Sequence, residues 1–117
     1  MKVLFAGSQS LSNKLIDDSV DTEFEILFAS NLQESMNIAL REDTQLCIYE
    51  WETYGLKLAN DIRQNPIERV SNLPIILLID SNLKFDFEQI QFYNIELVMR
   101  KPFLTSHLLK KVKNLCT

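Results

Sequence analysis

The chain has 117 residues, 46% of them hydrophobic, which suits one compact domain with its own core, spanning residues 1–117. Its formal net charge of −4 argues against a nucleic-acid-binding domain, because such a domain needs a strongly basic face. No apolar run approaches the length of about 18 residues that a membrane span requires, and the N-terminal stretch lacks the pattern of a signal peptide, so we expect a cytoplasmic protein that binds no membrane.

Apolar runs of strand length recur along the chain and alternate with segments of helical spacing. Five such runs lie at residues 3–6, 24–29, 46–49, 74–79 and 95–99. The segments between them carry apolar residues on one helical face, as at Leu32, Met36 and Ala39. Runs such as LPIILLI are apolar throughout, which is typical of parallel strands covered on both faces. The pattern predicts a doubly wound α/β fold, a five-stranded parallel sheet flanked by five helices.

The sequence contains no motif of a metal centre or a nucleotide site. His107 is the one histidine, and Cys47 and Cys116 lack the spacing of a metal-binding or redox pair. Gly7 opens the loop AGSQS, which lacks the glycine spacing of a dinucleotide or phosphate loop. We therefore expect neither a metal nor a cofactor.

In an open parallel sheet, functional residues gather at the carboxyl ends of the strands, where loops from several strands meet. We expect this crevice to be formed by the residues that follow the first, third, fourth and fifth runs. These residues are Gly7, Ser8, Glu50, Ile79, Asp80 and Lys101.

Several motifs, in this order and spacing, resemble the receiver domain of bacterial response regulators over essentially the whole chain. The most specific is Lys101-Pro102-Phe103 after IELVM, followed by a final helical segment. GLKLANDIR at residues 55–63 and LPII at residues 73–76 also fit, as does an acidic residue closing the third strand. The resemblance implies a flavodoxin-like, CheY-like fold with strand order 2-1-3-4-5 and a cis peptide bond between Lys101 and Pro102.

The resemblance also implies a reaction. In that family, an aspartate closing the third strand accepts a phosphoryl group from a histidine of a partner. Magnesium is held by this aspartate and by an acidic pair after the first strand. A hydroxyl group at the end of the fourth strand and the lysine before the proline then hold the phosphoryl oxygens.

At the positions that carry this chemistry, the sequence departs from the family's pattern. Glu50 stands where the acceptor aspartate lies, and Ile79 stands where the hydroxyl residue lies. Gly7 and Ser8 replace the acidic pair. Lys101 alone matches.

Each departure removes a part of the reaction. Magnesium usually needs carboxylates to compete with water, and two of the three are missing. Glu50 is one methylene group longer than aspartate, which moves its carboxylate out of the geometry for in-line attack. Ile79 offers no hydroxyl and places an apolar side chain in the path of a phosphoryl group. We therefore expect no catalytic residue and no metal, with Glu50 and Lys101 balancing each other's charge.

Glu50 allows two interpretations: a permanent mimic of the phosphorylated aspartate, or an acid paired with Lys101 for stability only. Two other functions stay open. Glu52 and Asp80 flank the crevice and could partly rebuild an acidic site, so that a histidine kinase would still phosphorylate the domain. The third function is a small-ligand sensor at the strand ends.

Aromatic residues cluster in SNLKFDFEQIQFYN, residues 81–94. At helical spacing the apolar residues of this segment divide into two faces, one of which should face the core. The other face leaves aromatic side chains exposed, and clustered exposed aromatics mark interaction sites. The resemblance implies that the fourth helix, fifth strand and fifth helix together bind partners or a second copy, and that Val98 lies where the family's switch aromatic often stands. We expect the partner-binding residues to be Phe85, Phe92, Tyr93 and Val98.

These expectations describe a pseudo-receiver, a phosphorylation-independent protein–protein interaction module of two-component signal transduction, and not an enzyme. The expected partner is a signalling protein, an output domain or a second copy of the chain that forms a homodimer.

Overall fold

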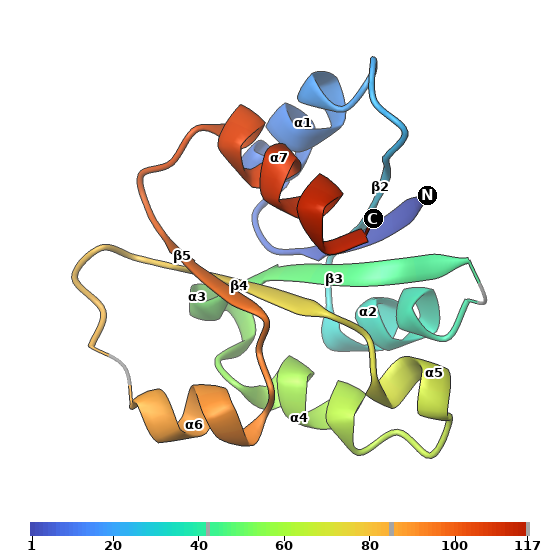
Figure 1. The fold of residues 1–117 in the computed structure, drawn as a ribbon, viewed down its shortest axis with the longest axis vertical. Helices are drawn as coiled ribbons and strands as arrows, with labels where there is room; N and C mark the ends of the chain where they lie inside the picture. The colour runs from blue at the N-terminus through green and yellow to red at the C-terminus, as the bar shows by residue number, and fades with distance from the viewer. Residues whose placement is uncertain (42, 85, 117) are drawn as a thin grey trace.

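A five-stranded parallel sheet runs through the centre of the molecule (Figure 1). The structure is a computed structural model and describes residues 1–41, 43–84 and 86–116. The strand order is β2-β1-β3-β4-β5, as the resemblance to receiver domains implies, and all neighbouring strands pair in parallel. The strands are β1 (Lys2–Ala6), β2 (Glu25–Ala29), β3 (Thr44–Glu50), β4 (Ile75–Ile79) and β5 (Leu97–Arg100).

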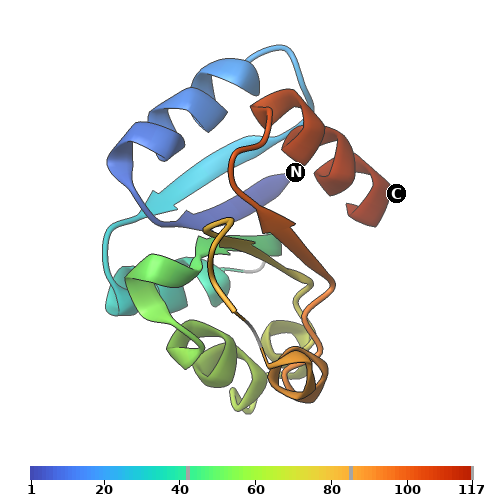
Figure 2. The ribbon, with the colours of Figure 1, turned by 90° about the vertical axis from the view of Figure 1, so that its left-hand side faces the viewer.

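Helices cover both faces of the sheet, with α1 and α7 on one side and α2 to α6 on the other (Figures 1 and 2). Within the described residues, no helix is long and apolar enough to cross a membrane. The helices are α1 (Gln9–Asp18), α2 (Leu32–Ala39), α3 (Trp51–Tyr54), α4 (Lys57–Arg63), α5 (Glu68–Ser71), α6 (Phe87–Phe92) and α7 (Thr105–Cys116).

The described residues thus form seven helices, where the sequence predicts five, because the connection between β3 and β4 is divided into three short helices. Gly55 separates α3 from α4, with a φ of 59° in the left-handed region that glycine adopts without strain. Farther along, Asn65 precedes Pro66, and a residue before proline disfavours helical backbone. The chain therefore leaves α4 before it enters α5.

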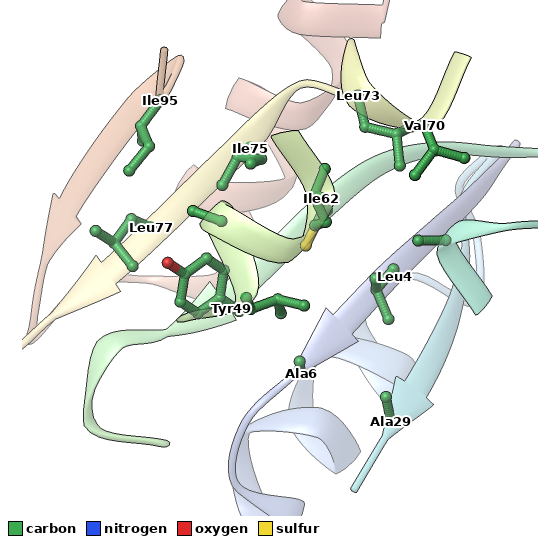
Figure 3. Packing of buried hydrophobic residues seen from close by; sticks show 14 of the residues in the cluster. Leu4, Ala6, Ala29, Tyr49, Ile62, Val70, Leu73, Ile75, Leu77 and Ile95 are labelled. Carbon is green, nitrogen blue, oxygen red and sulfur yellow. The ribbon is translucent and has the colours of Figure 1, made fainter. Parts of the chain in front are cut away.

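Alternate residues of each strand point to opposite faces of the sheet and build two apolar clusters. The cluster under α2 to α6 (Figure 3) includes Leu4, Cys47, Tyr49, Ile75, Leu77 and Ile79. The cluster under α1 and α7 includes Val3, Phe5, Leu46, Ile48, Ile76 and Leu78. Residues two apart in a strand share a face of the sheet. Position 7 therefore lies on the same face as Phe5, and Glu50 lies on the same face as Ile48, which is the face covered by α1 and α7.

Arg63, the last residue of α4, joins two segments of the chain, residues 71–73 before β4 and residues 93–94 after α6. Its guanidinium donates hydrogen bonds of 2.7–2.9 Å to the backbone carbonyl oxygens of Ser71, Leu73, Tyr93 and Asn94. Four carbonyl groups, at the end of α5, before β4 and after α6, are thereby satisfied by one side chain. This arrangement fixes the end of α6 relative to α4 and to the entrance of β4.

Candidate functional site

The ends of β1, β3 and β5 bring three residues into direct contact. The backbone N–H of Ser8 donates a hydrogen bond to Glu50 Oε1 with an N···O distance of 2.6 Å. The Lys101 ammonium donates to Glu50 Oε2 and forms a salt bridge with it. The Lys101–Pro102 peptide bond is cis. Residues from three separate strand ends therefore converge on one carboxylate, at the edge of the sheet where parallel strands end.

The Glu50 carboxylate is buried and both of its oxygens are engaged. Its side chain is 7% exposed. Burial by itself opposes ionisation, but hydrogen bonds from Lys101 and Ser8 outweigh this effect and hold the pKa of Glu50 below its usual range. Glu50 is thus a fixed negative charge at the end of β3.

Lys101 lies among three carboxylates. Besides Glu50, its Nζ lies 3.2 Å from Glu52 Oε2 and 4.0 Å from Asp80 Oδ1. Partial burial alone would lower the pKa of Lys101, but the hydrogen bond and charge of Glu50, helped by Glu52, raise it above its usual range. The cation that these acids surround is therefore the lysine ammonium.

The residues of this site do not fit magnesium. A magnesium ion needs several oxygen ligands in near-octahedral geometry, whereas Gly7 and Ser8 supply no carboxylate and the oxygens of Glu50 already accept N–H donors. Glu52 and Asp80, the candidates for a residual acidic site, lie 3.2 and 4.0 Å from the Lys101 ammonium. In the part of the chain that the structure describes, no three His, Cys, Asp or Glu side chains are arranged to hold a metal ion.

Gly7 is required by the length of Glu50. A Cβ atom placed on Gly7 would lie 2.9 Å from Glu50 Cγ and 2.9 Å from Phe5 Cζ, and closer still to Glu50 Oε1. The glutamate side chain therefore fills the space that any side chain at position 7 would need. A side chain at position 7 and a glutamate at position 50 exclude each other in this arrangement, a relation that the sequence interpretation missed.

A hollow of about 310 Å³ lies beside Glu50 and Lys101, at the lower end of the volumes of ligand sites. Lys14 of α1 and Phe103 also line it. Ile79 does not line it, because this residue is fully buried in the cluster under α2 to α6. Ile79 therefore offers no hydroxyl and does not fill the hollow; that its bulk lies in the path of a phosphoryl group stays a prediction.

Arg100, which the sequence interpretation also missed, fixes the loop after β4. Its Nη1 donates a hydrogen bond of 2.8 Å to the carbonyl oxygen of Leu83 and longer ones to those of Asp80 and Ser81. The end of β5 is thereby joined to the loop that leads toward α6. An arginine directly before the Lys-Pro motif is the only signal in the sequence for this contact.

The expected partner-binding residues differ in exposure. Phe92 is 78% exposed at the end of α6. Tyr93 packs its ring against Phe92 edge to face, with centroids 5.0 Å apart, and Tyr93 and Val98 also pack against the core. Phe85 lies outside the described residues. Phe92 is therefore the residue that a partner can reach most fully.

The Glu50–Lys101 pair is expected to stabilise the fold within a window of pH. Because the pKa of Glu50 is lowered on folding, its contribution is complete above its ordinary value of 4.5 and is lost as the pH falls through the folded pKa. Because the pKa of Lys101 is raised, its contribution is complete below 10.5 and is lost as the pH rises through the folded pKa. Urea unfolding across the pH range checks this. As the pH falls, the free energy of unfolding should decrease less for Glu50→Gln than for the wild type. An equal decrease in both proteins would contradict the prediction.

Comparison with known proteins identifies the fold. No protein-family model and no curated protein matches the chain. Among solved structures, the chemotaxis protein CheY4 of Vibrio cholerae aligns with a TM-score of 0.82 and 19% identity, covering 97% of this chain and 96% of that one. A response regulator receiver protein from Pseudomonas putida aligns with a TM-score of 0.78 and 21% identity, covering 97% of this chain and 95% of that one. A response regulator from Desulfuromonas acetoxidans aligns with a TM-score of 0.75 and 19% identity, covering 98% of this chain and 95% of that one. The chain therefore has the fold of response regulator receiver domains over nearly its whole length.

Proposed function

We propose that this protein is a pseudo-receiver, a cytoplasmic protein–protein interaction module of two-component signal transduction that works without phosphorylation, metal or catalysis. The observation that carries the proposal is the Glu50 carboxylate, buried and held between the Ser8 N–H and the Lys101 ammonium. The fold is that of signalling receivers. The chemistry that such a fold would need at its strand ends is replaced by an ion pair.

The ion pair explains why phosphoryl transfer is not expected. An attacking carboxylate oxygen has to reach phosphorus in line with the leaving group, but here both oxygens accept hydrogen bonds from the protein. Gly7 and Ser8 supply no carboxylate beside Glu50, and the nearby Glu52 and Asp80 lie around the Lys101 ammonium. In this proposal, Glu50 gives Lys101 permanently the anionic partner that a phosphorylated aspartate would give it transiently. Without differential phosphate binding there is no population shift to drive, and the domain presents one fixed surface.

Two other functions compete with this proposal. A receiver that a histidine kinase still phosphorylates would use Glu50 with Glu52 or Asp80, and the contacts of these acids with Lys101 speak against it. A small-ligand sensor would use the 310 Å³ hollow, in which Glu50 and Lys101 already satisfy each other and Lys14 is the further charged residue of the lining. Neither reading is favoured by a specific observation.

Phosphoryl incorporation distinguishes the proposal from the first competitor. The protein is incubated with acetyl phosphate and magnesium, and its intact mass is measured, with a phosphorylatable receiver treated in parallel as the positive control. We expect the mass of this protein to stay unchanged. A magnesium-dependent gain of one phosphoryl group that Glu50→Gln removes would overturn the proposal.

We further propose that partners bind on the face formed by α6, β5 and α7. The exposed ring of Phe92 supports this proposal. An aromatic side chain that is 78% exposed contributes little to the stability of the fold and is suited to a contact with a partner protein. The partner is a signalling protein, an output domain or a second copy forming a homodimer over this face. With its net charge of −4, the domain is not expected to bind nucleic acid.

Replacing Phe92 by Ser should leave stability within about 0.5 kcal/mol of wild type, because the ring is mostly exposed, and should abolish partner binding. Affinity capture with wild-type and Phe92→Ser baits checks this. Ile16→Ser, which also removes an exposed apolar side chain but lies on α1, is the matched control. Proteins retained equally by all three baits would count against Phe92 as a contact residue.

A further inference from the structure

Helix α6, which carries the exposed Phe92, is short and packs lightly against the rest of the fold. It has six residues, and a helix of this length is not stable through its own hydrogen bonds. Among the described side chains in and directly after this helix none is fully buried, and only Ile90 and Tyr93 are half-buried and pack against the core. Of residues 80–84 in the loop before it, all but Leu83 are exposed. The apolar core therefore holds α6 through few side chains.

Two arginines from other elements hold the backbone at both ends of α6, which lies beside α4 at the edge of the molecule (Figures 1 and 2). Before the helix, Arg100 Nη1 donates a hydrogen bond of 2.8 Å to the carbonyl oxygen of Leu83. After the helix, Arg63 donates hydrogen bonds of 2.7 and 2.9 Å to the carbonyl oxygens of Tyr93 and Asn94. Arg100 ends β5 and Arg63 ends α4, so both ends of α6 are attached to regular elements of the fold.

The hydrogen bonds of both arginines go to backbone carbonyl groups. Neither guanidinium takes part in a salt bridge of the described residues. A guanidinium carries five N–H donors in a fixed planar arrangement, so it can hold carbonyl groups at set distances and directions. Hydrogen bonds from a charged donor are also stronger than those between neutral groups. The two side chains therefore restrict the position of the backbone on either side of α6.

We propose that Arg100 is a positioning residue for partner binding: together with Arg63 at the opposite end, it holds α6 in one arrangement and thereby presents Phe92. This inference rests on the proposed function, in which a partner contacts Phe92. A partner that binds a mobile segment has to order that segment on binding, which lowers the affinity. Arg100 therefore raises the affinity through α6 and does not need to touch the partner.

Amide hydrogen exchange of the full chain, followed residue by residue by NMR, tests this role with Arg100→Met. The substitution keeps a long side chain and removes the donor to the Leu83 carbonyl. The amides of α6 should exchange about tenfold faster, the factor that corresponds to the loss of one hydrogen bond from a charged donor, while those of β1 and β3 keep their rates. Because Arg100 is exposed, the midpoint of urea unfolding should stay nearly unchanged. Arg63 is left in place, because it also binds carbonyl groups before β4.

Arg69→Met is the matched control for this substitution. Arg69 also donates to backbone carbonyl groups, those of Leu40 and Arg41 after α2, with distances of 2.7 and 2.8 Å. Its replacement makes the same change of charge and removes the same kind of contact at a different helix. The amides of α6 should therefore keep their wild-type exchange rates in this variant.

Partner binding gives the second measurement. A protein that the wild-type bait retains and the Phe92→Ser bait loses should be retained less by Arg100→Met and fully by Arg69→Met. The proposal is overturned if α6 in Arg100→Met exchanges at the wild-type rate, if exchange rises equally throughout the chain, or if a protein that requires Phe92 binds Arg100→Met at full strength. If no protein requires Phe92, the proposed partner-binding face fails instead, and the exchange rates still decide whether Arg100 fixes α6.

Discussion

Replacing Lys101 by Met should lower the free energy of unfolding by about 3 kcal/mol at neutral pH, near the lower end of the cost of breaking a buried ion pair. The loss is large because Glu50, only 7% exposed, keeps its charge with the Ser8 N–H as its remaining donor. Glu50→Gln should cost less, about 1–2 kcal/mol. Lys101 is 28% exposed and keeps Glu52 nearby, so that water and a second acid compensate it.

Urea unfolding of the two single variants and the double variant measures this asymmetry as a double-mutant cycle. Lys14→Met is the matched control, because Lys14 lines the same hollow but takes part in no salt bridge of the described residues. It should cost less than about 0.5 kcal/mol. If Lys101→Met and Lys14→Met lowered the free energy of unfolding by the same small amount, the Glu50–Lys101 ion pair would contribute nothing to the stability of the fold.

Gly7→Ala is the second substitution with a large expected effect, a loss of about 2–3 kcal/mol, as for overpacking of a filled core. The added methyl group clashes with the Glu50 side chain and the Phe5 ring. Glu50 cannot move away without breaking its hydrogen bonds with Lys101 and Ser8. Shortening position 50 should relieve part of this strain. Gly7→Ala with Glu50→Asp is therefore expected to be more stable, by about 1 kcal/mol or more, than the sum of the single changes.

Gly55→Ala provides the control for this cycle. Gly55 has a φ of 59° and a ψ of −130°, a conformation nearly restricted to glycine, but no atoms near its missing Cβ. The cost of Gly55→Ala, about 1–3 kcal/mol, therefore comes from the backbone and not from packing. Its effect should add to that of Glu50→Asp without coupling. If Gly7→Ala and Glu50→Asp were also additive, the mutual exclusion of a side chain at position 7 and a glutamate at position 50 would be wrong.

The sequence was sufficient to predict the sheet because its information is local. Continuous apolar runs mark strands buried on both faces, and the strand order follows from the resemblance carried by the Lys101-Pro102-Phe103 motif. The three-part connection between β3 and β4 was not predicted, although Gly55 and Pro66 stand where the helices break. A glycine or a proline ends a helix only when the surrounding packing favours the backbone conformation that the residue prefers.

The contacts of Glu50 with Lys101 and Ser8 could be predicted from the sequence, but the packing around them could not. Charge balance predicts that Glu50 meets Lys101, and parallel strand ends bring Ser8 beside them. The contact between Gly7 and Glu50 depends on distances of a few tenths of an ångström, which no spacing rule contains. The direction of Ile79 was available in principle, because it shares the period-two alternation of Ile75 and Leu77.

The central claim is that this receiver fold has exchanged its switch for a fixed ion pair. An amide NMR titration with magnesium and then beryllium fluoride, a mimic of the phosphoryl group, tests it most directly through the signals of Ser8, Glu50, Lys101 and α6. We predict that these signals stay in place at millimolar concentrations of both additions. Saturable shifts that spread from Glu50 to α6 would show a working phosphoryl switch and would contradict the account.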